Sequence, residues 1–271
     1  MLHLDEVRPD LAGLFGHKAV SLGELARGGF IVPPGFAISG RTFHEHVADL
    51  LGPSYWDLDA RAGQGGSLSS RLAEARGVVE SAPLGDELVA EIDEALRRLG
   101  LTGSPLAVRS SSTTEDGDLA SGAGVQQSLL GVVGRDELLS AVRAVWASLY
   151  TERAASYHGR ASSGGEPVLV AVIVQALVAP DAAGVLFTAN PVTGATDEIL
   201  VNCAFGLGEP VLSGLVTPDT FVVDKVTLTT TGRAVADKRV MSVVGPRGAP
   251  VGTATPEELR RRPSLNDEQL R

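Results

Sequence analysis

The sequence predicts an α+β protein, with a helix-rich first part and a sheet-rich second part. In the first hundred residues apolar side chains recur at helical spacing, most clearly between Leu84 and Leu99. After Gly164, four short apolar segments follow one another too closely for helical crossovers, which favours an antiparallel sheet. Hydrophobic residues make up 44% of the chain and charged residues 21%, which is typical of a globular protein with a substantial core.

The first part is predicted to contain three helices and one interrupted strand. Gly28 and Gly29 stop the first helix, and the prolines at 33 and 34 form a rigid turn within the strand. Gly100 suits the position just after a helix. The predicted elements are a helix at 17–27, extended segments at 30–32 and 36–38, and helices at 41–51 and 84–99.

The second part is predicted to begin near residues 100–105, where strand-like patterns replace helical ones. We therefore expect an N-terminal lobe over 1–104, a core lobe over 105–240 and a tail over 241–271. The predicted elements are a strand at 106–108 before a polar run at 110–114, a strand at 125–133, a helix capped by Asp136 that reaches Leu149, and strands at 168–178, 184–188, 198–204 and 220–223.

The tail carries two helix-start signals. Thr255–Glu258 is a capping box with proline at the first helical position, and Ser264–Asp267 has a similar composition. Because the sequence stops at Arg271, we expect the chain to be a fragment or to be completed by a partner. The alternative is a frayed natural C-terminus.

Charge and composition exclude several classes of protein. The formal net charge of −10 argues against a chain that tracks a nucleic-acid backbone or an anionic membrane. No apolar run approaches the length of a membrane span, no leader pattern opens the chain, and the single cysteine, Cys203, cannot form an internal disulfide. We expect a cytoplasmic protein.

Three local features predict an anion site. Lys18 lies in the first turn of a helix, where amide groups attract anions, although an exposed surface lysine is the simpler reading. Arg109 ends a buried strand beside hydroxyl side chains, an arrangement that suits phosphate. The turn formed by Ser121, Gly122, Ala123 and Gly124 could cover phosphates, or be only a polar surface loop.

Other polar positions are less specific. Gln175 interrupts an apolar strand, sharing a face with Ala171 and Ile173, and is either a satisfied core glutamine or a side chain that faces a pocket. Three polar turns, at 187–191, 206–209 and 217–219, suit ordinary turn chemistry and would also rim a cleft. None of the five histidines has a metal-site spacing, so we assign no residue to a metal.

Together, these residues resemble a known family. Five blocks occur in that family's order over roughly residues 10 to 240: 16–25 with 32–36, 107–116, 146–154, 184–191, and 206–209 with 218–219. They are similar to blocks of the phosphoenolpyruvate synthase, pyruvate phosphate dikinase and rifampin phosphotransferase family. The resemblance implies an ATP-grasp fold, with ATP held in a cleft between a helix-rich lobe and an antiparallel-sheet lobe.

The resemblance also implies roles for individual residues. Lys18 and Arg109 would be phosphate ligands and the catalytic residues of this chain. The turn at 121–124 would close over the phosphates, although Gly122 and Val125 depart from the usual residues. Gln175 and the backbone of Ala176, Leu177 and Val178 would receive adenine. Glu209 and Asp219 are motif members without an assigned role.

Family members split ATP to AMP and pass the β-phosphate to a histidine on a separate swivelling domain, then to an acceptor. The resemblance therefore implies ATP and Mg²⁺ as cofactors, and a phosphohistidine domain and an acceptor domain as partners. The family's acidic and glutamine metal-binding strands would follow Arg271. We expect this chain to bind ATP without completing the reaction.

The acceptor would be pyruvate, a rifampin-like antibiotic or another small molecule, and the segment 211–216 favours the rifampin branch. A second hypothesis is a non-catalytic ATP sensor or interaction module that keeps Lys18 and Arg109. A third, a scaffold without nucleotide, is less favoured because both phosphate-binding residue types are present.

Overall fold

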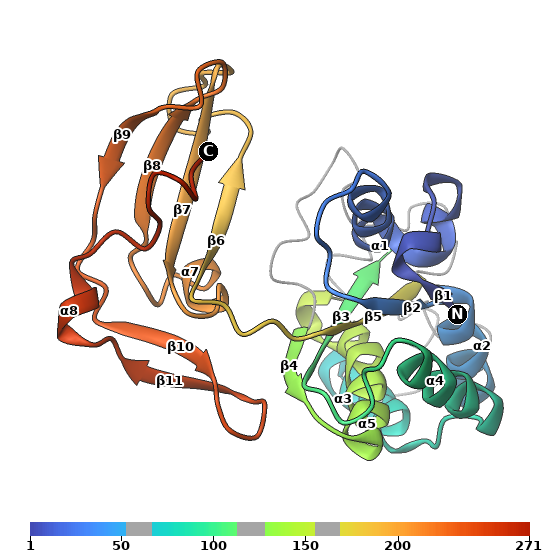
Figure 1. Cartoon of the computed structure of the whole chain (residues 1–271). Coiled ribbons are helices and arrows are strands. Elements are labelled where there is room, and N and C mark those ends of the chain that lie inside the picture. Colours follow the sequence, from blue (N-terminus) through green and yellow to red (C-terminus); the bar gives the residue numbers. More distant parts are fainter. Residues whose placement is uncertain (53–66, 113–127, 155–168) are drawn as a thin grey trace. The chain divides into compact units, whose positions relative to one another are not determined.

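The computed structural model describes residues 1–52, 67–112, 128–154 and 169–271. The chain forms two compact units, Met1–Leu177 and Val178–Arg271, each with its own sheet (Figure 1). Within the described ranges, no helix is both long enough and apolar enough to span a bilayer.

Unit 1 is built on a five-stranded antiparallel sheet. The strand order is β1-β2-β5-β3-β4, so β5 lies at the centre between β2 and β3. Five longer helices of the described residues lie around this sheet. The strands are β1 (Leu2–His3), β2 (Gly35–Ile38), β3 (Leu106–Ser112), β4 (Ser128–Val132) and β5 (Val170–Ala176), and the helices are α1 (Ala12–Arg27), α2 (Gly40–Leu51), α3 (Leu68–Ser81), α4 (Asp86–Arg98) and α5 (Arg135–Ala147), with short 3₁₀ turns at Leu4–Glu6, Pro9–Leu11 and Ser148–Tyr150.

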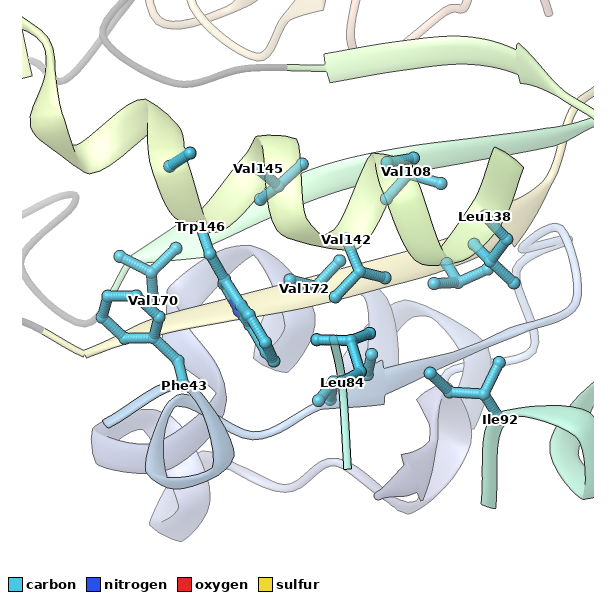
Figure 2. Packing of buried hydrophobic residues seen from close by; sticks show 14 of the residues in the cluster. Phe43, Leu84, Ile92, Val108, Leu138, Val142, Val145, Trp146, Val170 and Val172 are labelled. Carbon is cyan, nitrogen blue, oxygen red and sulfur yellow. The ribbon is translucent and has the colours of Figure 1, made fainter. Parts of the chain in front are cut away.

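The main core lies on one face of this sheet. Alternate residues of the strands, including Val108 and Val172, pack against helices α2 to α5. Figure 2 shows Val142, Val145 and Trp146 of α5 directed toward this layer. Trp146 is wholly buried, and its ring lies 5.8 Å from that of Phe43 on α2. A ring pair of this kind adds to the hydrophobic stabilisation that holds α2 and α5 on the sheet.

The opposite face of the sheet carries a smaller core. Here Ala37 of β2 and Ile173 of β5 pack with Phe15, Ala19 and Val20 of α1. Helix α1 therefore lies on the face of the sheet away from α5, and the sheet separates two layers of helix.

The starts of several helices follow from their sequences. Ser39 caps α2 by accepting a hydrogen bond from the Thr42 amide, and Ser67 caps α3 through the Ser70 amide. Helix α4 has acidic residues in its first turn and arginines in its last turn, as the helix dipole favours.

Unit 2 consists of a four-stranded antiparallel sheet and a separate hairpin. The sheet has the order β6-β7-β8-β9, and the hairpin pairs β10 with β11. Two four-residue helices complete the unit. The elements are β6 (Ala182–Phe187), β7 (Glu198–Phe205), α7 (Glu209–Leu212), β8 (Asp219–Asp224), β9 (Thr230–Ala234), β10 (Val240–Val244), β11 (Pro250–Ala254) and α8 (Glu257–Arg260).

The α+β class is confirmed, but the grouping of strands differs from the expectation. The segment predicted at 168–178 forms β5, which pairs with β2 and β3 rather than with β6 to β8. The chain accordingly divides into its two compact units between Leu177 and Val178, whereas we expected a boundary at 104/105 and a separate tail from 241. The physical reason is that β2 lies before residue 104 and β3 and β5 after it, yet all three share one sheet.

Two smaller predictions are wrong, and a third differs in its position. Residues 30–32 are not a strand, because β2 begins only at Gly35, after the two prolines. Strand β3 continues to Ser112, beyond the predicted end at Arg109, so the first part of the polar run at 110–114 belongs to the strand. The helix-start signal at 264–267 gives one capped turn that begins at Asn266, where the Asn266 side chain accepts from the Gln269 amide and the Gln269 side chain accepts from the Asn266 amide. Ser264 is not the cap of this turn, and its amide and hydroxyl donate hydrogen bonds to Asp219.

Candidate nucleotide-binding site

The predicted site residues of unit 1 share one face of its sheet. In the register of β3 with β5, Ala107 pairs with Gln175 and Arg109 pairs with Ile173. Side chains alternate along a strand, so Arg109 and Gln175 lie on the face to which Ile173 belongs. Because Ile173 packs against α1, this is the face that α1 partly covers.

Lys18 is brought to the same face by a break in α1. Gly16 has φ 73° and ψ 164°, so the helix stops there and starts again at His17. Lys18 lies in the first turn of this second segment and is half-buried. The amides of a first helical turn attract anions, and the Lys18 ammonium adds a full positive charge.

Ser111 connects the Lys18 segment to the Arg109 strand. Its Oγ accepts a hydrogen bond from the Ala19 amide over 3.3 Å. Ser111 lies two residues after Arg109 in β3, so both side chains are on the same face. The structure thus brings Lys18 and Arg109, 91 positions apart in the chain, to one region of unit 1. Sequence reasoning placed Ser111 in the polar run after the strand and gave it no role.

The segment predicted to receive adenine is largely occupied by contacts within unit 1. Gln175 is 5% exposed, and its Nε2 donates to the Pro33 carbonyl over 3.2 Å. The amides of Ala176 and Leu177 donate to the carbonyls of Pro34 and Pro105. Val178 is exposed and begins unit 2. The Gln175 side chain therefore has a hydrogen-bond partner within unit 1.

The predicted phosphate loop, Ser121, Gly122, Ala123 and Gly124, lies outside the described residues. Among the residues that the structure does describe, no three His, Cys, Asp or Glu side chains gather closely enough to hold a metal ion. The described part of the chain therefore does not fit a dedicated magnesium site made only of protein ligands.

Asp219, a motif member without an assigned role, is the centre of a buried polar cluster in unit 2. It is wholly buried, and its Oδ1 accepts from Lys238 Nζ over 2.7 Å and from the Ala236 amide over 2.9 Å. Its Oδ2 accepts from the amide and the hydroxyl of Ser264, over 2.7 and 2.8 Å. Both carboxylate oxygens thus accept two hydrogen bonds each from groups inside the unit.

Two other motif residues of unit 2 are Asn190 and Glu209. Asn190 is buried, accepts hydrogen bonds from the amides of Val192 and Thr193, and donates to Glu198. These contacts hold the turn between β6 and β7 in shape. Glu209 is exposed at the first position of the short helix α7.

Comparison with known proteins identifies the family. The pyruvate phosphate dikinase AMP/ATP-binding domain family matches residues 12–271. A rifampicin phosphotransferase from a Streptomyces species is 41% identical over 268 residues, covering 96% of this chain and 30% of that protein. A phosphoenolpyruvate synthase of Aeropyrum pernix is 39% identical over 235 residues, covering 83% and 28%.

A third similar protein is named as another kind of transferase. A prodigiosin synthesizing transferase of Serratia marcescens is 36% identical over 255 residues, covering 94% of this chain and 27% of that protein. The chain spans about 27 to 30% of the length of these curated relatives. The resemblance seen in five sequence blocks is confirmed, and the chain belongs to the pyruvate phosphate dikinase AMP/ATP-binding domain family.

Proposed function

We propose that this chain binds ATP, with Lys18 and Arg109 as ligands of its phosphates. The observation that carries the proposal is their convergence: Arg109 stands on the α1 face of the sheet, and the Ser111 contact holds the Lys18 segment to the same strand. An ammonium and a planar guanidinium on one surface suit the negative, multidentate surface of a polyphosphate.

We further propose that the chain is the nucleotide-binding part of a dikinase-type phosphotransferase. ATP is split to AMP, and the β-phosphate passes through a phosphohistidine on another domain or chain to a small-molecule acceptor such as a rifampin-like antibiotic or pyruvate. Phosphoryl transfer depends mainly on positioning and charge neutralisation, which are what Lys18 and Arg109 supply.

Further contacts are proposed for the adenine, the phosphates and the Mg²⁺ ion. With the amides of Ala176 and Leu177 already bonded, adenine would be received by the other backbone groups at 175–178. The turn at 121–124 is proposed to cover the phosphates. Mg²⁺ would be held through the phosphate oxygens of ATP and would neutralise part of their charge. Since ATP is an intracellular nucleotide, we also propose a cytoplasmic location.

Thermal unfolding of the whole chain with Mg²⁺-ATP, with AMP and without ligand tests the binding proposal. ATP at 100 times its dissociation constant adds about 2.7 kcal/mol to the free energy of unfolding. In a chain of this size that raises the melting temperature by about 5 to 10 °C. We expect this rise in the wild type and its loss in Lys18→Ala and Arg109→Ala.

Matched controls come from the same chain. Lys225 donates to a backbone carbonyl in unit 2, and Arg135 pairs with Asp93 at the start of α5, on the opposite side of the unit 1 sheet. Lys225→Ala and Arg135→Ala should keep the full ATP shift. A folded wild type that shows no shift with millimolar ATP would refute the proposal. ATP binding without phosphate transfer to an added histidine domain would identify the sensor alternative instead.

A further inference from the structure

The restart of α1 at Gly16 has an unusual cap. In a helix start of this type, the residue before the first helical position normally caps one of the first amides with its own side chain. Here that residue is Gly16, which has no side chain. The cap is supplied instead by Ser111 of β3, whose Oγ accepts from Ala19, the third residue of the new helical segment.

Gly16 is required by both its conformation and its surroundings. Its φ of 73° lies in the left-handed region, which disfavours side chains. A Cβ atom placed on Gly16 would also lie 2.5 Å from Ser111 Oγ and 2.7 Å from the Ser112 carbonyl oxygen. The helix start therefore rests directly on the end of β3, and only glycine allows that approach.

This contact fixes the spacing of the two proposed phosphate ligands. Lys18 is held between Gly16 and Ala19, both of which touch Ser111. Arg109 lies two residues before Ser111 in a strand that is paired on both sides, with β4 and β5. Ser111 is wholly buried, so its hydroxyl has little freedom to move away from the Ala19 amide.

We propose that Ser111 is a positioning residue for Lys18, capping the Lys18 helix segment from β3 and thereby setting Lys18 against Arg109 for one polyphosphate. The proposal rests on the proposed function, since it concerns ATP binding at those residues. Ser111 need not contact ATP; it acts through the position of Lys18.

The effect of removing the hydroxyl should depend on the phosphates of the ligand. In Ser111→Ala the buried Ala19 amide loses its acceptor, and the first helical turn with Lys18 shifts or frays. Loss of a helix cap corresponds to about a five- to tenfold change in an equilibrium constant. We expect ATP affinity to fall by about that factor, and the affinity for adenosine, which has no phosphate, to stay unchanged.

A double-mutant cycle on the whole chain provides the decisive test. Dissociation constants for Mg²⁺-ATP are measured by calorimetry for the wild type, Ser111→Ala, Lys18→Ala and the double variant. If Ser111 acts through Lys18, then Ser111→Ala costs about five- to tenfold in the wild type and less than about twofold in the Lys18→Ala background. Ser110→Ala is the control, because Ser110 is buried in the same strand with its side chain on the opposite face.

A glycine pair tests the same contact from the helix side. Gly16→Ala would insert a Cβ against Ser111 and should weaken ATP binding at least as much as Ser111→Ala. Gly13→Ala, three residues earlier in α1 and with no atom within 4 Å of its added Cβ, should leave binding unchanged. Should Gly16→Ala fail to fold, Ser111→Ala and its cycle still decide the question.

The outcomes separate this inference from the proposed function. Additive effects of Ser111→Ala and Lys18→Ala, an equal loss for adenosine and ATP, or no loss at all would overturn the role of Ser111 while ATP binding through Lys18 stands. A wild type that does not bind ATP, or a Lys18→Ala variant that binds it as well as the wild type, would refute the proposed function and this inference with it.

Discussion

The Asp219–Lys238 pair concentrates charge in the interior of unit 2. The two side chains are 0% and 1% exposed, and Lys238 Nζ also donates to the Ala236 carbonyl and lies 5.5 Å from the centre of the Phe205 ring. Burying two charges is tolerated only when each is paired and hydrogen-bonded, as both are here. Removal of one partner would leave the other as an unpaired charge in an apolar interior.

Lys238→Met should therefore destabilise unit 2 strongly. Methionine fills a similar volume but leaves Asp219 without its cation, which costs about 3 to 5 kcal/mol in buried pairs of this kind. The free energy of unfolding by urea, followed by circular dichroism, measures the change. Lys225→Met is the control and should change stability by less than about 0.5 kcal/mol. A small loss in Lys238→Met would show that the pair contributes little.

At this scale, the sequence predicts residue types better than it predicts partners. Lys18 and Arg109 could be proposed because each stands at a recognisable local position, a helix start and a strand end. Ser111 and Lys238 could not, because their partners Ala19 and Asp219 are set by folding and not by neighbouring residues. A serine at a strand end looks the same whether it faces solvent or caps a helix 92 positions away.

Among the elements, β5 is the central strand of unit 1 and contributes to both of its cores. It pairs with β2 on one side and with β3 on the other, and its two faces contribute to both cores. The pairing of β2 with β5 depends on Gly35, which lies opposite Gln175. A Cβ on Gly35 would lie only 2.3 Å from the Val174 carbonyl oxygen and 2.8 Å from Gln175 Cγ.

Gly35→Ala should therefore separate β2 from β5 and reduce the stability of unit 1. Overpacking of this kind costs about 1 to 3 kcal/mol, because the clash is with backbone that cannot easily give way. The comparison is Gly77→Ala in α3, where an added Cβ meets nothing within 4 Å and alanine favours the helix. Denaturant unfolding should show opposite signs for the two variants. Equal stability of Gly35→Ala and the wild type would contradict this packing argument.

The sequence could predict that these strands exist but not how they pair. The apolar runs that form β5 and β7 look alike, yet β5 joins the sheet of unit 1 and β7 that of unit 2. Local periodicity shows which face of a strand is buried, but not which strand lies beside it. Strand pairing is therefore decided by contacts between distant parts of the chain. The same limit explains Ser264, because the composition of 264–267 indicates a capped turn but does not show that Ser264 binds Asp219 while Asn266 caps the turn.

For the whole molecule, the division at Leu177/Val178 follows from which residues share a core. The expected boundary at 104/105 followed a change of local pattern, whereas the compact units follow the sheets, and β2 and β3 lie on opposite sides of residue 104 in one sheet. Each unit has its own sheet and its own buried residues. We therefore expect each to have its own opening equilibrium.

Cys203, the single cysteine of the chain, provides a probe of opening in unit 2. It is 2% exposed, and burial raises the pKa of its thiol, although a hydrogen bond with Ser264 opposes that shift. Alkylation requires the thiolate, so a buried thiol with a raised pKa should react with iodoacetamide at neutral pH only after unit 2 opens.

The alkylation rate of Cys203 should report the opening of unit 2 and not that of unit 1. Lys238→Met lies in the same buried cluster and should raise the rate by about 100-fold or more, because the expected loss of stability is about 3 kcal/mol or more. Gly35→Ala destabilises unit 1 and should leave the rate within about twofold of the wild type. Mass spectrometry of timed samples measures both rates, with urea-unfolded chain giving the intrinsic rate. If Gly35→Ala accelerated labelling in proportion to its loss of stability, the two units would open as one cooperative body, because a defect in one core would then be transmitted to the other.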